Sequence, residues 1–454
     1  MKISLLVAEI GSTTTVVNAF NDLDTCPKFI GQGQSATSVL EGDVNIGLKG
    51  AIDDLAKNLG EESIDYDELI ATSSAAGGLR MTVHGLVYDM TVKAAKEAAL
   101  GAGANIKFIT AGRLRKSDLR KIQEIKPNII LIAGGVDYGE RDTALYNAEL
   151  ISEMNLNIPV IYAGNIENHE DIKEIFQGKE TELYIVDNVY PKIDELNVEP
   201  TRKVIQEVFE KHIIHAPGME HVREMVTGPI MPTPGAVMEA SQLLYDDIGD
   251  LLTIDVGGAT TDVHSVTEDS DEISRILINP EPKAKRTVEG DLGVYVSMKN
   301  VVEMMGKEEL TKELKISMEE LENLIFHHKP IPETNLEKRF VEELTLHATI
   351  TAVRRHAGGL KHLYGPSGKK TIAEGKDLTQ VKYIIGTGGA LTRLPNRKKI
   401  LSEIALSNKG NDLLPNTEAE ILIDNHYIMA SLGVMAKKYP QVALKLLENS
   451  LKGE

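Results

Sequence analysis

The feature that most constrains this chain is a short motif that occurs once in each half. It consists of an apolar strand, an acidic residue, glycine and hydroxyl-bearing residues, in that order. The first copy is AEIGSTTT, residues 8–15, and the second is DVGGATTD, residues 255–262. In each copy an apolar run ends in a carboxylate, glycine follows and a β-branched run resumes, which predicts a hairpin. Backbone amides at such a turn, with nearby hydroxyl groups, can bind anionic oxygens. One turn alone is typical of an ordinary hairpin, but two favour a clamp for a phosphorylated ligand.

These turns supply the candidate phosphate ligands. Glu9 ends the first strand and is placed to hold a Mg²⁺-bound water, and Asp255 occupies the same place in the second copy. The phosphate-binding candidates are Gly11, Ser12, Thr13, Thr14, Gly257, Gly258, Ala259, Thr260 and Thr261. A third segment, GTGGAL, follows a short strand run, and its glycines permit close contact with a flat base and ribose. Its adenosine-binding candidates are Gly386, Thr387, Gly388 and Gly389.

The length of 454 residues favours more than one domain. Strand and helix signals alternate from residue 69 to residue 191, which predicts a parallel sheet covered by helices. Glycine and proline then punctuate the chain near residue 230, and the opening pattern restarts at Leu251. We therefore expect a first lobe over 1–235, completed by a C-terminal helix within 424–454, and a second lobe over 236–423.

Hydrophobic periodicity predicts most of the helices. The last of them should be followed by a polar tail that frays. The expected helical ranges are 45–58, 92–100, 296–305, 308–314, 318–327, 337–363 and 425–437.

Charge and cysteine content exclude several classes of function. With 68 acidic and 49 basic residues the net charge is −19, which disfavours nucleic acid and anionic membranes as partners. No apolar run is long enough for a transmembrane helix. The single cysteine, Cys26, excludes an internal disulfide and fits a reducing cytoplasm. GPSGKKT, residues 365–371, resembles a P-loop, but its glycines are too close together, which favours a basic surface turn.

Together the motifs resemble those of the actin, sugar-kinase and heat-shock-chaperone superfamily. Phosphate-1, the first connecting helix, phosphate-2, the adenosine motif and the second connecting helix correspond in order to residues 9–14, 232–237, 255–262, 386–389 and 424–434. The resemblance implies an α/β fold of two ribonuclease H-like lobes, with ATP or ADP and Mg²⁺ in the cleft between them. It also gives Asp255 the role of orienting Mg²⁺ or the attacking water, with Glu9 opposite.

Further segments resemble one family of this superfamily, the glutamate mutase accessory ATPases called MutL or GlmL. These segments are TSSAAGGLRMTVHGLV (72–87), IILIAGGVDYGERD (129–142), RTVEGDLGV (286–294) and AVRRHAGG (352–359). The resemblance implies a slow, chaperone-like ATPase that reactivates an adenosylcobalamin-dependent aminomutase, of the glutamate mutase or ornithine aminomutase type, by releasing damaged cobalamin. It also makes Glu289, Gly290 and Asp291 candidates for nucleotide or metal contacts, and it leaves a homodimer open.

Two departures from the superfamily pattern concern hydrolysis. Glu9 stands where the superfamily usually has aspartate, so its carboxylate reaches one methylene further. Met231 falls roughly where chaperone ATPases carry a glutamate, which favours slow turnover. Two other functions remain as alternatives: a small-molecule kinase for a sugar or an acid, and an actin-like structural filament protein.

Overall fold

The computed structural model describes residues 1–11, 14–38, 42–74, 79–212, 218–219, 221–365, 368–408 and 410–453. The chain divides into two compact units. Unit 1 comprises Met1–Ala240 and Ala430–Leu446, and unit 2 comprises Ser241–Met429 and Leu447–Glu454. Helices α8 (Thr233–Ile248) and α17 (Pro440–Lys452) continue from one unit into the other. The division lies inside α8, a few residues after the expected boundary at residue 235.

The first sheet of unit 1 is built on the opening hairpin. Its strand order is β3-β2-β1-β4-β10, with β1, β2 and β3 antiparallel and with β4 and β10 parallel to β1. The order 3-2-1-4-5 with these directions is that of a ribonuclease H-like sheet. Helix α1 packs on this sheet through Leu48 and Leu55, and Asp43 caps its first turn. The bounds are β1 Lys2–Ile10, β2 Thr14–Asn21, β3 Lys28–Ala36, β4 Asp65–Ser73, β10 Ile230–Pro232 and α1 Val44–Asn58.

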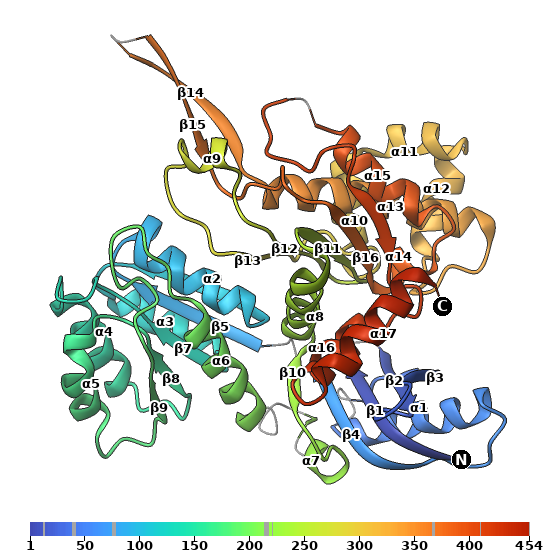
Figure 1. Ribbon diagram of the computed structural model, residues 1–454, viewed down its shortest axis with the longest axis horizontal. Helices are drawn as coiled ribbons and strands as arrows, with labels where there is room; N and C mark the ends of the chain where they lie inside the picture. The colour runs from blue at the N-terminus through green and yellow to red at the C-terminus, as the bar shows by residue number, and fades with distance from the viewer. Residues whose placement is uncertain are drawn as a thin grey trace. The chain divides into compact units, whose positions relative to one another are not determined.

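An inserted domain between β4 and β10 contains a second, wholly parallel sheet of order β6-β5-β7-β8-β9. This is the order of doubly wound, flavodoxin-like sheets. Ile129 and Leu131 of β7 join one core with α2 and α6, whereas Ile130 and Ile132 join another with α3, α4 and α5 (Figure 1). Burial of both faces explains the continuous apolar run. The strands are β5 Leu79–Gly85, β6 Ala104–Ala111, β7 Ile129–Ile132, β8 Val160–Tyr162 and β9 Leu183–Ile185.

Helices alternate with these strands as expected. Tyr88–Val92 forms a π-helical turn, η3, directly before α2, and Ile166–Asn168 forms a 3₁₀ turn, η4, before α5. The remaining helices before α8 are α2 Lys93–Gly101, α3 Lys116–Ile125, α4 Asp142–Glu153, α5 His169–Phe176, α6 Glu199–His212 and α7 Val222–Met225.

The central sheet of unit 2 repeats the plan of the first sheet of unit 1. Its order is β13-β12-β11-β16-β17, again with three antiparallel strands followed by two parallel ones. The duplicated ribonuclease H-like fold expected from the two glycine turns is therefore confirmed by the strand order itself. The bounds are β11 Leu251–Val256, β12 Thr261–Val266, β13 Ala284–Glu289, β16 Tyr383–Thr387 and β17 Glu420–Ile423.

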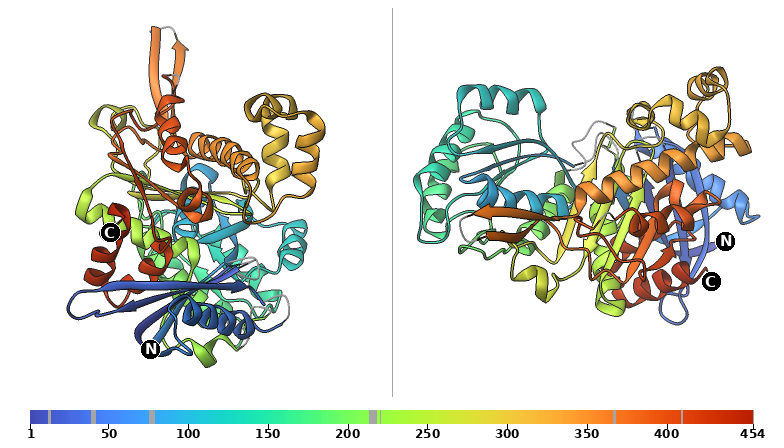
Figure 2. Two further views of the ribbon diagram at one scale, coloured as in Figure 1. Left: turned by 90° about the vertical axis from the view of Figure 1, so that its right-hand side faces the viewer. Right: turned by 90° about the horizontal axis from the view of Figure 1, so that it is seen from above.

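Helices and a separate hairpin complete unit 2. The 22-residue helix α13 packs against β12 and β13, and the two-stranded hairpin of β14 and β15 extends from the unit (Figure 2). Within the described ranges no helix is both long and apolar enough to cross a lipid bilayer. The bounds are α9 Asp271–Ser274, α10 Met298–Met305, α11 Lys307–Leu314, α12 Met318–Phe326, α13 Asn335–His356, α14 Gly388–Arg393, α15 Arg397–Leu406, β14 Gly359–Gly365 and β15 Gly368–Glu374.

Three sequence expectations need correction. The strand signal at residues 69–74 belongs to β4 of the first sheet, because β4 pairs with β1, so the inserted sheet begins only at β5. The helix expected over 337–363 ends at His356, because Ala357 takes an extended conformation and β14 begins at Gly359. The expected polar tail is instead the helix α17, which buries Ala443, Leu446 and Leu447.

Candidate nucleotide site

The phosphate-2 segment forms a tight turn between β11 and β12. The amide of Gly257 donates to the carbonyl of Thr260 at 2.9 Å and closes the turn. Asp255 and Asp262 lie directly opposite each other in the antiparallel register. Opposed residues of a strand pair project from the same face of the sheet. The two acids of the motif therefore lie side by side at the end of the hairpin.

Asp262 is held by a buried arginine that sequence analysis did not select. The Nε of Arg286 donates to Asp262 Oδ1 at 3.0 Å, and Nη2 donates to the same oxygen. The hydroxyl of Thr260 donates to Asp262 Oδ2 at 3.1 Å. Arg286 is only 2% exposed and Asp262 5%. Asp262 is thus committed to an ion pair and orients the hydroxyl group of a predicted phosphate ligand.

Asp255 has the opposite electrostatic environment. Burial and, next in size, the nearby carboxylate of Asp262 raise the pKa of its carboxyl group to about 7, against the lowering effect of Arg286. The carboxylate of Asp424 adds a smaller upward shift of this pKa. A carboxyl group that titrates near neutral pH can accept and return a proton under physiological conditions. This perturbation marks Asp255 as a candidate functional group.

The adenosine segment meets phosphate-2 at Asp255. Strand β16 runs parallel to β11 and places Thr387 opposite Asp255. Gly388 has φ +81°, and a Cβ there would lie 2.3 Å from Oδ1 of Asp255, so only glycine fits. By contrast, nothing lies within 4 Å of a Cβ built at Gly389. Two motifs that are far apart in sequence therefore form one contiguous surface within unit 2.

Asp424 fixes the adenosine turn from the other side and was also missed as a site residue. It accepts hydrogen bonds from the hydroxyls of Thr387 at 3.0 Å and Ser450 at 2.7 Å. Its carboxylate also accepts from the amides of Ile428 and Met429, which precede or begin α16. Helix α16 spans Met429–Ala436. Because a carboxylate at this place satisfies amides of a helix start, Asp424 joins the adenosine turn to that helix.

The acidic loop after β13 lies on the phosphate-2 turn. The carbonyl of Gly258 accepts from the amides of Tyr295 at 2.8 Å and Val296 at 2.7 Å, and Gly257 accepts from Val294 at 3.1 Å. A Cβ at Gly293 would lie 2.3 Å from the carbonyl carbon of Ala259. This close packing fixes the conformation of the turn, a contact that the sequence pattern did not predict.

Both acids of that loop are paired with an arginine. Arg355 donates to Glu289 at 2.7 Å and to Asp291 at 2.8 and 3.0 Å. These bonds lower the pKa of Asp291 and raise that of Arg355. A Cβ at Gly290 would meet nothing within 4 Å. The pairing brings the 286–294 and 352–359 segments together, while the predicted role of Glu289, Gly290 and Asp291 in nucleotide or metal contact stays a prediction.

The phosphate-1 turn of unit 1 has the expected shape where it is described. The amide of Gly11 donates to the carbonyl of Thr14 at 3.0 Å, and β2 begins at Thr14. Ser12 and Thr13, the other two predicted ligands of this turn, lie outside the described residues. The position of the turn between β1 and β2 matches that of phosphate-2 between β11 and β12.

Glu9 is tied to α16. Its Oε1 accepts from the amide of Ser431 at 3.1 Å and from the Ser431 hydroxyl at 2.6 Å, and Asn18 donates to the same oxygen at 3.4 Å. Glu9 is 7% exposed. Nearby, a Cβ at Gly433 would lie 1.8 Å from the carbonyl oxygen of Ala236, so α8 and α16 touch at small residues. Glu9 thus anchors the second predicted connecting helix within unit 1.

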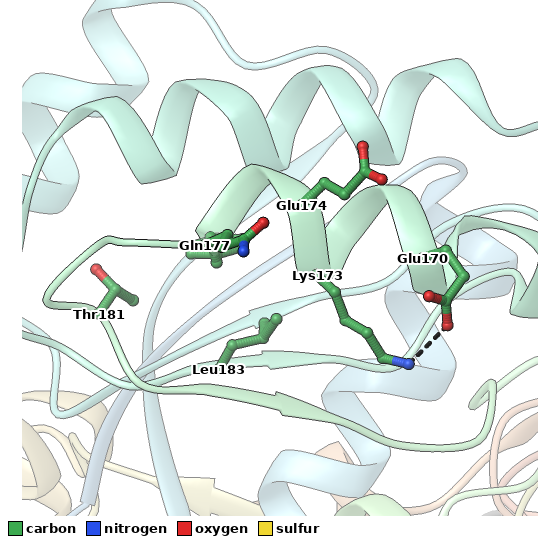
Figure 3. A pocket seen from close by; sticks show the side chains of 7 residues that line it. Glu170, Lys173, Glu174, Gln177, Thr181 and Leu183 are labelled. Atoms are coloured by element: carbon green, nitrogen blue, oxygen red, sulfur yellow. Dashed lines mark hydrogen bonds and ion pairs between the residues drawn. The ribbon is translucent and has the colours of Figure 1, made fainter.

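An open depression elsewhere in unit 1 is separate from these residues. It lies beside α5 and β9, and Figure 3 shows Lys173 reaching Glu170, with which it forms an ion pair of 2.7 Å. None of the predicted nucleotide ligands lines it. Its lining residues are Glu170, Lys173, Glu174, Phe176, Gln177, Thr181 and Leu183.

Comparison with known proteins assigns the family. The sequence profile of the family described as MutL protein matches residues 5–451. The chain belongs to the MutL protein family. Protein MutL of Clostridium tetanomorphum is 35% identical to this MutL family member, and the match covers 98% of each chain. The family expected from the sequence segments is thereby confirmed.

Two solved structures that resemble this MutL family member are distant from it in sequence. A nucleotide-free diol dehydratase-reactivating factor is 11% identical, with a TM-score of 0.39 over 97% of this chain and 100% of that chain. Nucleotide-free acetone carboxylase is 12% identical, with a TM-score of 0.39 over 96% of this chain and 70% of that chain. Neither likeness carries an argument at these scores, and the fold rests on the strand orders described above.

Proposed function

We propose that this protein is a chaperone-like ATPase that reactivates an adenosylcobalamin-dependent aminomutase by ATP-driven release of damaged cobalamin. The observation that carries the ATPase part is the contact between Asp255 and the Gly388 turn, on a sheet of ribonuclease H-like order. A carboxyl group with a pKa of about 7 then lies beside a turn that accepts only glycine. Membership of the MutL protein family supports the chaperone part.

The nucleotide would be held by backbone amides and hydroxyl groups. In unit 2, residues 257–261 would bind phosphate oxygens and residues 386–389 would contact adenosine. In unit 1, Gly11 and Thr14 would bind phosphate through the turn that their hydrogen bond closes. The Thr260 hydroxyl donates its one hydrogen to Asp262, which Arg286 holds in place, so this hydroxyl would turn from Asp262 to a phosphate oxygen when nucleotide binds.

The oxygen donors of the site fit Mg²⁺, which prefers carboxylates, phosphate oxygens and water. In the described part of the chain no three His, Cys, Asp or Glu side chains gather as a metal site. We propose that Asp255 and Glu9 would hold Mg²⁺ through water, together with the nucleotide's own phosphates. When bound, it would neutralise charge on the phosphate oxygens.

Asp255 would accept a proton from the attacking water. Its raised pKa suits this role, because a base with a pKa near the working pH is present in its ionised form and still binds a proton. Met231 is 3% exposed in β10 and brings no second carboxylate at that position. We propose that ATP hydrolysis is slow for this reason. Slow hydrolysis would keep each nucleotide state long enough for the protein to act as a switch.

The decisive experiment incubates the chain with inactivated glutamate mutase or ornithine aminomutase, ATP, Mg²⁺ and free adenosylcobalamin. We expect mutase activity to return with the native chain and with ATP, and not with the Asp255→Asn variant. Failure of both mutases to recover would contradict the reactivation proposal. Transfer of labelled γ-phosphate to a sugar or an acid would establish the kinase alternative, and nucleotide-dependent polymers in electron micrographs would establish the filament alternative.

A further inference from the structure

In the part of the hairpin of β14 and β15 that the structure describes, backbone hydrogen bonds join the hairpin to unit 2 at its base. The amide of Ala373 donates to the carbonyl of Ile276 at 2.8 Å, and the amide of Ile278 donates back to Ala373 at 3.0 Å. On the other strand, the amide of Leu360 donates to Asn411 at 2.8 Å. Both strands therefore enter the hairpin from fixed positions in the body of the unit.

Beyond this base the hairpin extends away from unit 2, as two views show (Figures 1 and 2). Lys361, His362, Lys369 and Lys370 are exposed, and Leu363 is 53% exposed. A two-stranded hairpin without a packed face is marginally stable at best, and its free edges invite pairing with other chains. The outer part adds no buried core to unit 2, so folding of the unit does not explain its length.

The outer hairpin combines positive charge with an exposed apolar side chain. Leu363 lies opposite Lys370, and Lys361 lies opposite Ile372, so these four residues share one face. Lys361 is paired with Glu374. Among the residues that the structure describes, no carboxylate lies within ion-pair distance of Lys369 or Lys370. A basic projection thus stands out on a chain whose net charge is −19.

We propose that the outer β14–β15 hairpin is a docking arm for a protein that presents an acidic surface. Lys369 and Lys370 would steer and orient the partner, because exposed charges act mainly on association rate and register. Leu363 would supply the apolar contact that slows dissociation. Nucleic acid and anionic membranes present extended negative charge that the net charge of −19 repels, whereas an acidic patch on a protein is local and can lie against the lysines and Leu363 alone. This inference rests on the proposed function for the partner's identity, which is the mutase itself.

The test measures binding to immobilised, inactivated glutamate mutase and ornithine aminomutase at low and at high salt. We expect the double substitution Lys369→Glu with Lys370→Glu to weaken binding about tenfold at low salt and less at high salt. Leu363→Ala should weaken it about tenfold at both salt concentrations. The matched control carries Lys398→Glu and Lys399→Glu, two adjacent exposed lysines on α15, and should bind like the native chain. None of these variants should change ATP hydrolysis without mutase.

Each other outcome overturns the docking arm. Native-like binding by both hairpin variants, with reactivation intact, would exclude the arm and leave the proposed function standing. If the native chain neither binds nor reactivates either mutase, the proposed function and the arm both fail. Charge-dependent binding to anionic vesicles or duplex DNA, with mutase binding unaffected, would assign the hairpin to another class of partner. A change from dimer to monomer in the variants, measured by sedimentation, would assign it to a second copy of this chain.

Discussion

At the scale of single residues, two aspartates of one motif illustrate how surroundings assign roles. Asp255 and Asp262 lie opposite each other on neighbouring strands. Asp262 is paired with Arg286, whereas Asp255 is partly buried and its pKa is raised to about 7. Environments that separate two carboxyl groups in this way are typical of sites where one group binds and the other exchanges protons.

Asp255→Asn should lower ATP hydrolysis about 100-fold, since an amide cannot accept the proton. In the native chain, hydrolysis should rise as pH increases through about 7, where Asp255 ionises. Phosphate release measured between pH 5.5 and 8.5, a range of about three units around this pKa, tests both expectations. The exposed control Asp246→Asn should behave like the native chain, and unchanged turnover in Asp255→Asn would remove Asp255 from the mechanism.

The raised pKa of Asp255 also predicts that the stability of the native chain and that of Asp255→Asn depend differently on pH. The unfolded chain releases this proton near pH 3.8, but the folded chain holds it up to about pH 7. The folded state therefore binds more protons between these values, and the contribution of Asp255 to stability falls as pH rises through this window. Relative to Asp255→Asn, the native chain should lose stability from about pH 4 to about pH 7, as measured by urea unfolding. A constant difference across the window would contradict the assigned pKa.

At the scale of elements, the turn between β16 and α14 contains two adjacent glycines whose surroundings differ. Gly388 has a positive φ and no space for a side chain beside Asp255, whereas Gly389 faces open space. A sequence shows only that both are glycine. The structure shows that a side chain does not fit at the first, and we propose that the second contacts the ligand.

Gly388→Ala should destabilise unit 2 by about 1–3 kcal/mol, because the new Cβ is strained and collides with the Asp255 carboxyl group. Gly389→Ala should leave stability within about 0.5 kcal/mol of the native chain and should weaken ATP binding if adenosine lies on that glycine. Thermal unfolding and nucleotide titration separate the two effects. Equal stability of the two variants would show that the turn adapts without cost.

At the scale of the whole molecule, the chain contains the same sheet order twice, once in each compact unit. Unit 1 also contains the inserted parallel sheet, which shares one core with the first sheet and has a second core of its own. Proteins with several domains need not unfold in one step. Nucleotide bound to the folded chain stabilises whichever unit holds it.

We expect ATP with Mg²⁺, at about 100 times its dissociation constant, to raise the free energy of unfolding by about 2.7 kcal/mol. The transition that belongs to unit 2 should move, because the adenosine turn and phosphate-2 both lie in that unit. Differential scanning calorimetry with and without ATP measures the shift, and Gly389→Ala, the variant expected to bind ATP more weakly at native stability, serves as the control. An unshifted unit 2 transition in the native chain would contradict nucleotide binding at these motifs.

The sequence by itself determined the local chemistry of the protein. The glycine turns, the apolar runs and the alternation of strands with helices depend on residues close together in the chain, so they predicted both hairpins, most helices and the duplicated α/β fold. Errors arose where pairing over long distances decides the outcome. The strand at residues 69–74 pairs with β1 and not with the strands of the inserted sheet. The expected polar tail is the helix α17, because packing against the rest of the chain buries its apolar face.

Only the tertiary structure decided which side chains hold the candidate site together. Glu9 meets Ser431 across 422 positions, Thr387 meets Asp424, and Arg286 meets Asp262. No local pattern specifies these partners, because a hydrogen bond depends on distance in space and not on spacing in the chain. The sequence thus named the acids and glycines of the predicted phosphate clamp. Folding decided that Asp262 would be neutralised by arginine while Asp255, beside it, would keep a proton until about pH 7.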